Sequence, residues 1–101
     1  MKTLSIGPLN DLAKEIWEIA ESKGFHNDRR LPEILTLIHS ELSEAFEAWR
    51  DDDVLGTNLE LVDALIVILD VLRSREADID GLMSSKLAVN RERPYQHGRK
   101  I

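Results

Sequence analysis

The chain has 101 residues, of which 43% are hydrophobic and 32% charged, and this predicts one folded domain spanning residues 1–101. The apolar content excludes a disordered chain, and the longest uninterrupted apolar run, Ala64–Leu69, is far too short for a membrane span. The absence of cysteine excludes disulfides, thiolate metal sites and a cysteine nucleophile. The first residues lack the apolar core of a signal peptide, so we expect a cytoplasmic protein.

The net charge of −6 is divided unevenly along the chain. Residues 86–101 carry a net charge of +4, so the first 85 residues carry −10. An acidic body argues against a nucleic-acid partner, because nucleic-acid-binding proteins present a basic face to the phosphate backbone. An acidic body with a basic tail suits a phosphate ligand bound through a metal ion. The tail also reduces the self-repulsion of the body, and charge alone does not separate these two interpretations.

Apolar residues recur at three- and four-residue steps along most of the chain, which predicts helices. The first helix begins near Pro8, because proline suits the first helical turn, and stops at Gly24. The second helix begins near Pro32 and ends in the run Arg50–Asp53, since aspartates are unfavourable at the negative end of a helix dipole. Its apolar stripe ends in Trp49, which we expect in the core.

The segment Leu59–Leu72 is the most apolar part of the chain, with eleven hydrophobic residues among fourteen. Its content of Val and Ile would also suit a strand, but strands of this length are unusual, so we predict a third helix. A helix that is apolar nearly all round lies at the centre of a fold or packs against a second subunit. Because so small a domain has few other elements to cover it, we expect an oligomer formed through this central helix.

A fourth helix begins near Asp78 or Asp80, either of which can cap it, and ends before Pro94. Residues 94–101 form a polar, basic tail that we expect to be mobile without a ligand. Strand signals are nearly absent. The sequence therefore predicts an all-α protomer that resembles a four-helix bundle.

Four acidic residues border the predicted core instead of lying on the opposite, wet face of their helices: Glu41, Glu44, Glu60 and Asp63. They form two pairs, one in the second helix and one in the third, and the three-residue spacing places both members of each pair on one face. If the two helices are neighbours, four carboxylates meet, and protons or cations must offset their repulsion. Oxygen ligands without cysteine favour Mg²⁺ or Mn²⁺, and Mg²⁺ commonly binds carboxylates and substrate phosphates together.

Each acidic pair alone also has an ordinary interpretation. Thr57 and Glu60 fit a capping box at the start of the third helix. Glu41 and Glu44 fit a solvated acidic stripe that continues to Glu47. A di-iron carboxylate bundle would need Glu-x-x-His pairs, and no glutamate of the chain is followed by histidine at that spacing. The predicted metal site therefore depends on the two pairs occurring together.

Lys86 and Asn90 lie one helical turn apart in the fourth helix, and Arg93 follows three residues later. The two basic side chains can hold phosphate oxygens, and the asparagine can orient a ligand hydroxyl or a metal-bound water. The other interpretation is an exposed helix end, whose negative dipole favours nearby cations. Trp17 and Phe25 are candidates for stacking on a base, and packing against the fold is the other explanation of each ring.

Taken in order, these motifs resemble those of the MazG-like all-α nucleoside triphosphate pyrophosphohydrolases. Three segments carry the resemblance: Glu41-x-x-Glu44, then Glu60-x-x-Asp63 after a spacer of fifteen residues, then Lys86-x-x-x-Asn90-x-x-Arg93 with the closing run Arg93–Lys100. The resemblance covers the chain from about Leu9 to its end. Many members carry Glu-Glu-x-x-Glu in the first motif, whereas the leading position here is Ser40.

The resemblance implies Mg²⁺-dependent hydrolysis of (deoxy)nucleoside triphosphates to the monophosphate and pyrophosphate, in a housecleaning role for the nucleotide pool. The four acids would bind the ion, and one of them, Glu41 or Glu44, would take a proton from the attacking water. Lys86, Asn90 and Arg93 would contact the phosphates. Family members are dimers or dimers of dimers. The alternative is a non-enzymatic helical oligomer, an interaction module with a vestigial site, and in either case we expect no nucleic-acid or membrane partner.

Overall fold

The computed structural model describes residues 7–95, and these residues fold into helices without a strand. The helices are α1 (Pro8–Ser22), α2 (Leu31–Arg50), α3 (Val54–Ser74) and α4 (Ile79–Glu92). The predicted all-α class is thereby confirmed. Residues 1–6 and 96–101 lie outside the described residues, and with them most of the predicted basic tail. None of the described helices is long and apolar enough to cross a membrane.

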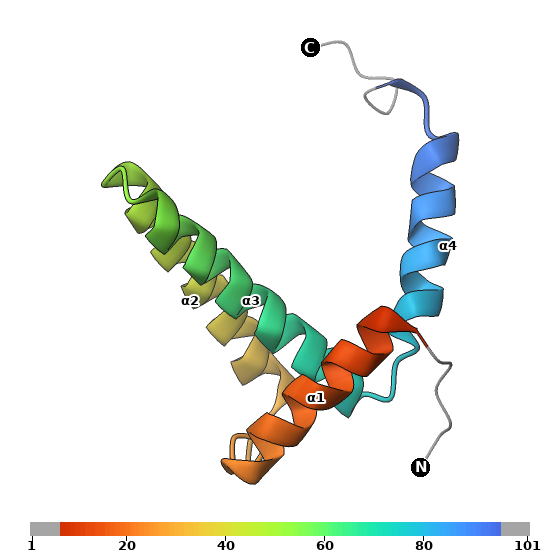
Figure 1. Cartoon of the computed structure of the whole chain (residues 1–101), viewed down its shortest axis with the longest axis horizontal. Coiled ribbons are helices and arrows are strands. Elements are labelled where there is room, and N and C mark those ends of the chain that lie inside the picture. The colour runs from red at the N-terminus through yellow and green to blue at the C-terminus, as the bar shows by residue number, and fades with distance from the viewer. Residues whose placement is uncertain (1–6, 96–101) are drawn as a thin grey trace.

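The α2 and α3 helices form a long antiparallel hairpin, and α1 crosses the hairpin near the end of α3 (Figure 1). In contrast, α4 extends away from the hairpin, and its main contact is with the beginning of α1. A single chain therefore packs three of its helices together and leaves the fourth projecting. A closed four-helix bundle, with assembly through the central helix, stays a prediction.

Prolines and acidic caps set most helix boundaries as the sequence predicts. Pro8 and Pro32 lie in the first turns of α1 and α2. Just beyond the end of α1, Gly24 adopts a left-handed φ of 74°, which glycine tolerates without strain. Asp78 caps α4 by accepting a hydrogen bond from the Gly81 N–H.

The α3 helix begins at Val54, earlier than the predicted Leu59. Asp53 caps its N-terminus by accepting a hydrogen bond from the Gly56 N–H at 2.9 Å. Thr57 lies inside the helix, where its hydroxyl donates to the Asp53 carbonyl. The alternative capping box of Thr57 with Glu60 is therefore wrong, because the helix has already begun before both residues.

The N-termini of α1 and α4 cap each other. The Asp80 carboxylate accepts hydrogen bonds from two backbone N–H groups in the first turn of α1, at 3.1 and 2.8 Å. In return, the Asn10 side chain, which is only 3% exposed, accepts from the Ile79 N–H and donates to the Asp78 carboxylate. A Cβ at Gly7 would collide with the Asp80 carboxylate, so glycine leaves room for this contact. The reciprocal capping sets the direction in which α4 leaves the other helices.

The buried core is small and lies where α1 crosses α3. Its buried members are Ala13, Leu69 and Ile79, and Leu9, Ile16 and Leu72 pack against them. Farther along the hairpin, the buried side chains include two alanines, Ala45 and Ala64. Trp49, predicted to lie in the core, is instead 65% exposed. The reason is that α1 covers only one end of the hairpin, so no third described helix packs over its outer part (Figure 1).

His26, in the loop after α1, connects this loop to α3 through contacts with carboxylates. Its Nδ1 lies 2.6 Å from Oε2 of Glu21, and its Nε2 lies 2.9 Å from both carboxylate oxygens of Asp70. An ionised carboxylate only accepts hydrogen bonds, so contacts to carboxylates at both ring nitrogens favour the imidazolium form, in which both nitrogens donate. Partial burial lowers the pKa of His26, but hydrogen bonds to Glu21 and Asp70 outweigh it and raise the pKa above its ordinary 6.5. The ring also stacks on Trp17, with centroids 5.1 Å apart.

Replacement of Asp80 by alanine should destabilise the chain by about 1–2 kcal/mol, the usual cost of losing a helix cap. Urea denaturation followed by circular dichroism measures this loss. Glu92→Ala is the matched control on the same helix, and it should not lower the free energy of unfolding, because an acid at a helix C-terminus is unfavourable. A loss for Asp80→Ala no larger than that of the control would contradict the capping role.

The His26 contacts should make stability depend on pH. A raised pKa in the folded state means that this stabilisation is complete below the unfolded pKa of 6.5 and is lost as pH rises through the folded value. Between about pH 6 and about pH 9, the free energy of unfolding of the wild type should therefore fall more steeply than that of His26→Gln. Parallel pH profiles in urea denaturation would show that the imidazolium does not hold the loop.

Candidate metal centre

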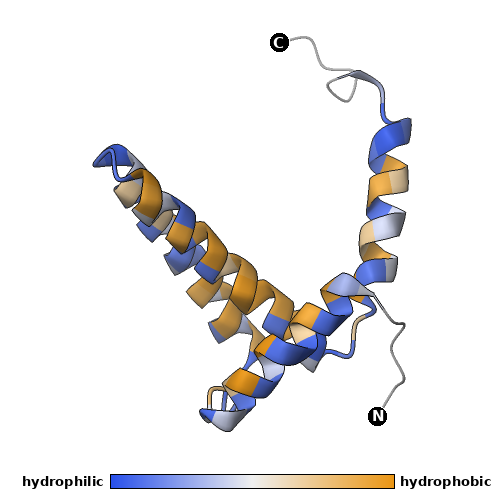
Figure 2. Ribbon diagram, viewed as in Figure 1, coloured by the Kyte–Doolittle hydropathy of each residue, from blue (hydrophilic) through white to orange (hydrophobic). Residues whose placement is uncertain are grey.

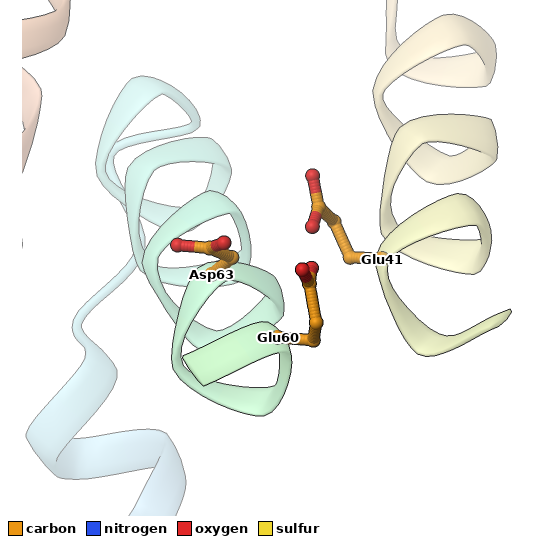
Figure 3. Close-up of side chains that lie close together, drawn as sticks. All are labelled: Glu41, Glu60 and Asp63. Atoms are coloured by element: carbon orange, nitrogen blue, oxygen red, sulfur yellow. The ribbon is translucent and has the colours of Figure 1, made fainter. Parts of the chain in front are cut away.

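Three of the four acids selected from the sequence meet in the space between α2 and α3. Glu41 projects from α2, and Glu60 and Asp63 project from α3, with one carboxylate oxygen of each within 4.8 Å of the others. Figure 3 shows the Glu41 carboxylate extending from α2 toward the carboxylate of Glu60. Glu41 and Glu60 are half-buried, whereas Asp63 is exposed. Acids on two different helices therefore form one group that is open to solvent on one side.

The register of the hairpin explains this meeting. Asp52 is the middle residue of the turn between α2 and α3. Glu44 and Glu60 lie eight residues before and after it, and Glu41 and Asp63 lie eleven residues before and after it. Because two antiparallel helices rise equally per residue, residues at equal distances from the turn lie at the same height. The two pairs are therefore level with each other across the hairpin.

Glu44 belongs to the same group through its interaction with Glu60. A hydrogen bond between these two side chains, which needs a proton on one of them, raises the pKa of Glu44 above its ordinary 4.5, and the negative charge of Glu60 adds to the shift. The pKa of Glu60 is also raised, first by a hydrogen bond to Glu41. Both shifts have the same origin, because like charges held close together compete for protons.

One oxygen of Glu60 lacks a partner. Its Oε2 is closed off from solvent and accepts no hydrogen bond from the described residues. A buried carboxylate oxygen without a donor or a cation is costly. The group thus combines one orphaned oxygen with exposed carboxylates on Glu44 and Asp63. Such a set of hard oxygen ligands fits a divalent cation that keeps part of its water shell, as Mg²⁺ does.

The predicted phosphate ligands are not brought to the acids within one chain. Lys86 and Asn90 are exposed on α4, and Arg93 is its C-cap. Because α4 extends away from the hairpin, this helix lies apart from the acidic group (Figure 1). Periodicity predicts which residues share a helix face, but the direction of the helix depends on the capping contacts with α1.

Trp17 lies near the end of α3, away from the acids. Its indole N–H donates to the Ser74 hydroxyl at 3.0 Å, and its ring stacks on His26. The side chain therefore packs α1 against α3. A contact between Trp17 and substrate stays a prediction, and this position favours the packing role instead.

A pocket of about 350 Å³ lies between the end of α1, the loop after it, α2 and α3. Its walls are mainly apolar, and His26, Arg29 and Asp70 are the ionisable residues among them. Asp70 follows Asp63 by seven residues, or about 10 Å along α3. Sequence analysis missed this pocket because it arises where a loop closes against two helices. The only local signal was Phe25 beside His26 just after the Gly24 stop.

No protein-family model, no curated protein and no solved structure matches this chain. The candidate metal centre therefore stands on the geometry of its own residues. The family resemblance of the motifs stays a prediction.

Replacement of Glu60 by glutamine should stabilise the metal-free protein at neutral pH. The raised pKa values of Glu44 and Glu60 mean that the folded state binds protons more tightly than the unfolded chain. This part of the stability is therefore present near pH 4.5 and is lost as pH rises through the raised values. In EDTA at about pH 7.5, the Tm of Glu60→Gln should exceed that of the wild type, and the difference should shrink toward about pH 5.

Millimolar Mg²⁺ should stabilise the wild type, because a ligand that binds only the native state raises the free energy of unfolding. The Tm of the wild type should rise, whereas that of Glu60→Gln should change little. Glu92→Gln is the matched control outside the acidic group, and it should respond to Mg²⁺ as the wild type does. A wild type that is more stable than Glu60→Gln in EDTA would contradict the repulsion on which this prediction depends.

Proposed function

We propose that the chain is a magnesium-dependent hydrolase of (deoxy)nucleoside triphosphates, which releases the monophosphate and pyrophosphate. The observation that carries the proposal is the convergence of acids from α2 and α3 around Glu60, whose Oε2 has no hydrogen-bond partner among residues 7–95. A group made only of carboxylate oxygens suits Mg²⁺ or Mn²⁺. The order of the acidic and basic motifs along the chain supports the same function, with nucleotide-pool housecleaning as its role.

The acidic side chains would have two roles, metal binding and proton acceptance. Glu41, Glu60 and Asp63 would hold the ion, together with Glu44. When bound, the ion supplies positive charge for the substrate phosphates and lowers the pKa of a water. The oxygen of a water beside these carboxylates would bond to the α-phosphorus, and the bond from this phosphorus to the bridging oxygen would break, so that pyrophosphate leaves. Glu41 or Glu44, on the α2 side, would accept the proton of this water.

The pocket beside His26 offers a place for the nucleobase. Phe25, at its wall, is 54% exposed and presents a ring on which a base can stack, an interaction of roughly 1–3 kcal/mol. The guanidinium of Arg29 can donate hydrogen bonds to the edge of a base. Because the pocket and the acids lie about two helical turns apart on α3, a nucleotide that lies along this helix would reach both.

The proposal predicts turnover in a panel of ribo- and deoxynucleoside triphosphates with Mg²⁺, assayed for pyrophosphate. Glu44→Gln or Asp63→Asn should lower kcat by about a hundredfold or more, as expected when a proton acceptor or metal ligand is lost. Glu18→Gln, an exposed acid on α1, is the matched control and should leave kcat unchanged.

The alternative function is a non-enzymatic interaction module. The large exposed apolar side chains of α2, α3 and α4 favour assembly, whether or not the chain is an enzyme. If no nucleotide in the panel is hydrolysed, and the acid-to-amide variants are only more stable than the wild type, the chain is such a module and the proposed hydrolysis is wrong.

A further inference from the structure

The loop between α1 and α2, residues 23–30, forms one side of the pocket of about 350 Å³. Phe25, His26 and Arg29 of this loop line the pocket, and its other walls come from α1, α2 and α3. Figure 2 shows that α3 is mostly apolar toward its crossing with α1, and Asp70 is the acid that α3 contributes to the wall. The shape of the pocket therefore depends on where the loop lies relative to α3.

Within residues 7–95, one side chain makes the hydrogen bonds that join this loop to α3. The Nε2 of His26 lies 2.9 Å from both carboxylate oxygens of Asp70, and its Nδ1 lies 2.6 Å from Glu21 near the end of α1. The other hydrogen bonds of the loop connect its own residues or join it to the adjacent turns of α1 and α2. His26 thus bridges α1 and α3 and holds the loop beside the pocket.

This bridge is shielded from water, whereas other parts of the loop are open. The side chains of His26 and Asp70 are 19% and 18% exposed, and the His26 ring stacks on Trp17. In contrast, Phe25 is 54% exposed. Asp28 has a left-handed φ of 58°, which is unfavourable for residues with a side chain. The conformation of the loop therefore depends on the charge-assisted hydrogen bonds of His26, which are stronger than neutral ones.

The charge of the imidazolium also sets the charge of the pocket wall. Asp70 places a carboxylate in a mainly apolar wall, where a negative charge without a partner is costly. The α2 side of the pocket, Ile34 and Leu37, carries no charge, and Arg29 is the other basic side chain of the wall. A neutral His26 can donate from only one ring nitrogen, so one of its two carboxylates would lose its donor. Loss of this proton would therefore weaken the bridge between the loop and α3.

We propose that His26, as an imidazolium, is a positioning residue that joins the 23–30 loop to α3 and so holds the pocket in the shape that receives a nucleobase. This inference rests on the proposed function, because the base belongs to the nucleoside triphosphate that the acids would hydrolyse. His26 acts through Glu21 and Asp70 and touches no reacting atom. Its loss should therefore lower the affinity for substrate, since a binding-competent loop that is only partly populated weakens binding in proportion.

The same bridge should make substrate affinity depend on pH. The pKa of His26 is raised above its ordinary 6.5, so the imidazolium holds the loop at neutral pH and releases it as pH rises through the folded value. The groups that face the ring are Glu21 from α1 and Asp70 from α3, with Arg29 on the same pocket wall. At alkaline pH, the wild type should come to resemble a variant without the imidazolium.

Steady-state kinetics with the nucleoside triphosphate that is hydrolysed fastest test this role. At about pH 7, His26→Gln should raise KM about tenfold with little change in kcat, because a hydrogen bond to a charged group contributes about that factor to an equilibrium constant. The ratio of the KM of His26→Gln to that of the wild type should fall toward one by about pH 9. This ratio cancels the titration of the nucleotide and of the acidic group.

Glu33→Gln is the matched control, because it breaks the exposed contact between Arg30 and Glu33 at the end of the same loop. It should leave KM as in the wild type at each pH. A KM for His26→Gln equal to that of the wild type, or a raised ratio that does not change with pH, would overturn the positioning role of the imidazolium.

A double-mutant cycle tests whether His26 acts through Asp70. Asp70→Asn should also raise KM at neutral pH, and the double variant should have a KM no higher than that of His26→Gln alone. The reason is that both substitutions break one contact, so their effects are not additive. Additive effects would show that the two side chains act independently and would overturn the proposal.

Amide hydrogen exchange in the full chain tests the loop without any need for activity. The Phe25 and Asn27 N–H groups donate hydrogen bonds in the loop, at 3.0 and 3.2 Å. At about pH 7 they should exchange about tenfold faster in His26→Gln than in the wild type, because local opening of the loop exposes them. In Glu33→Gln their exchange should be unchanged.

The two measurements together separate this inference from the proposed function. Equal exchange in His26→Gln and the wild type would overturn the role of His26 in holding the loop. Faster exchange with an unchanged KM would overturn its role in substrate binding. Faster exchange in a protein that hydrolyses no nucleotide would support the bridge to α3 and contradict the proposed function.

Discussion

Carboxylates held close together raise each other's free energy unless a proton or a cation lies among them. This chain places such a group between its two longest helices, where the Glu41, Glu44 and Glu60 side chains are close enough to share protons. The antiparallel register holds the backbone positions of these acids level with one another, so their side chains lie close together in the folded hairpin. The repulsion is therefore a property of the metal-free fold, and uptake of a proton or of a divalent cation would relieve it.

The α1 and α4 helices are placed differently relative to this hairpin. The α1 helix crosses one end of it, and the His26 contacts to Glu21 and Asp70 close the loop that forms the pocket wall. The α4 helix is directed away from the hairpin by Asp80 and Asn10. A small core at the crossing of α1 and α3 is enough to hold these directions, but it leaves much of α2, α3 and α4 uncovered. The fold of one chain thus leaves large apolar side chains of these helices exposed.

Local chemistry made much of this structure predictable. Helix starts near Pro8 and Pro32, and the cap at Asp78, follow from proline geometry and carboxylate capping. The acidic group follows from three-residue spacing together with equal distances from the turn. In contrast, the direction of α4 depends on a hydrogen bond between residues that are 70 positions apart in the sequence, Asn10 and Asp80. No periodicity in the sequence reports such a contact, so the separation of Lys86 from the acids could not be predicted.

The central claim is that the carboxylates of α2 and α3 form one divalent cation site. The most direct measurement is an electron paramagnetic resonance titration of Mn²⁺ into the metal-free full chain at neutral pH, because the sharp signal of free Mn²⁺ diminishes when the ion binds protein. The wild type should remove this signal until a fixed stoichiometry per chain is reached, whereas Glu60→Gln should leave it close to that of buffer. Equal signals for wild type, Glu60→Gln and buffer would contradict the site.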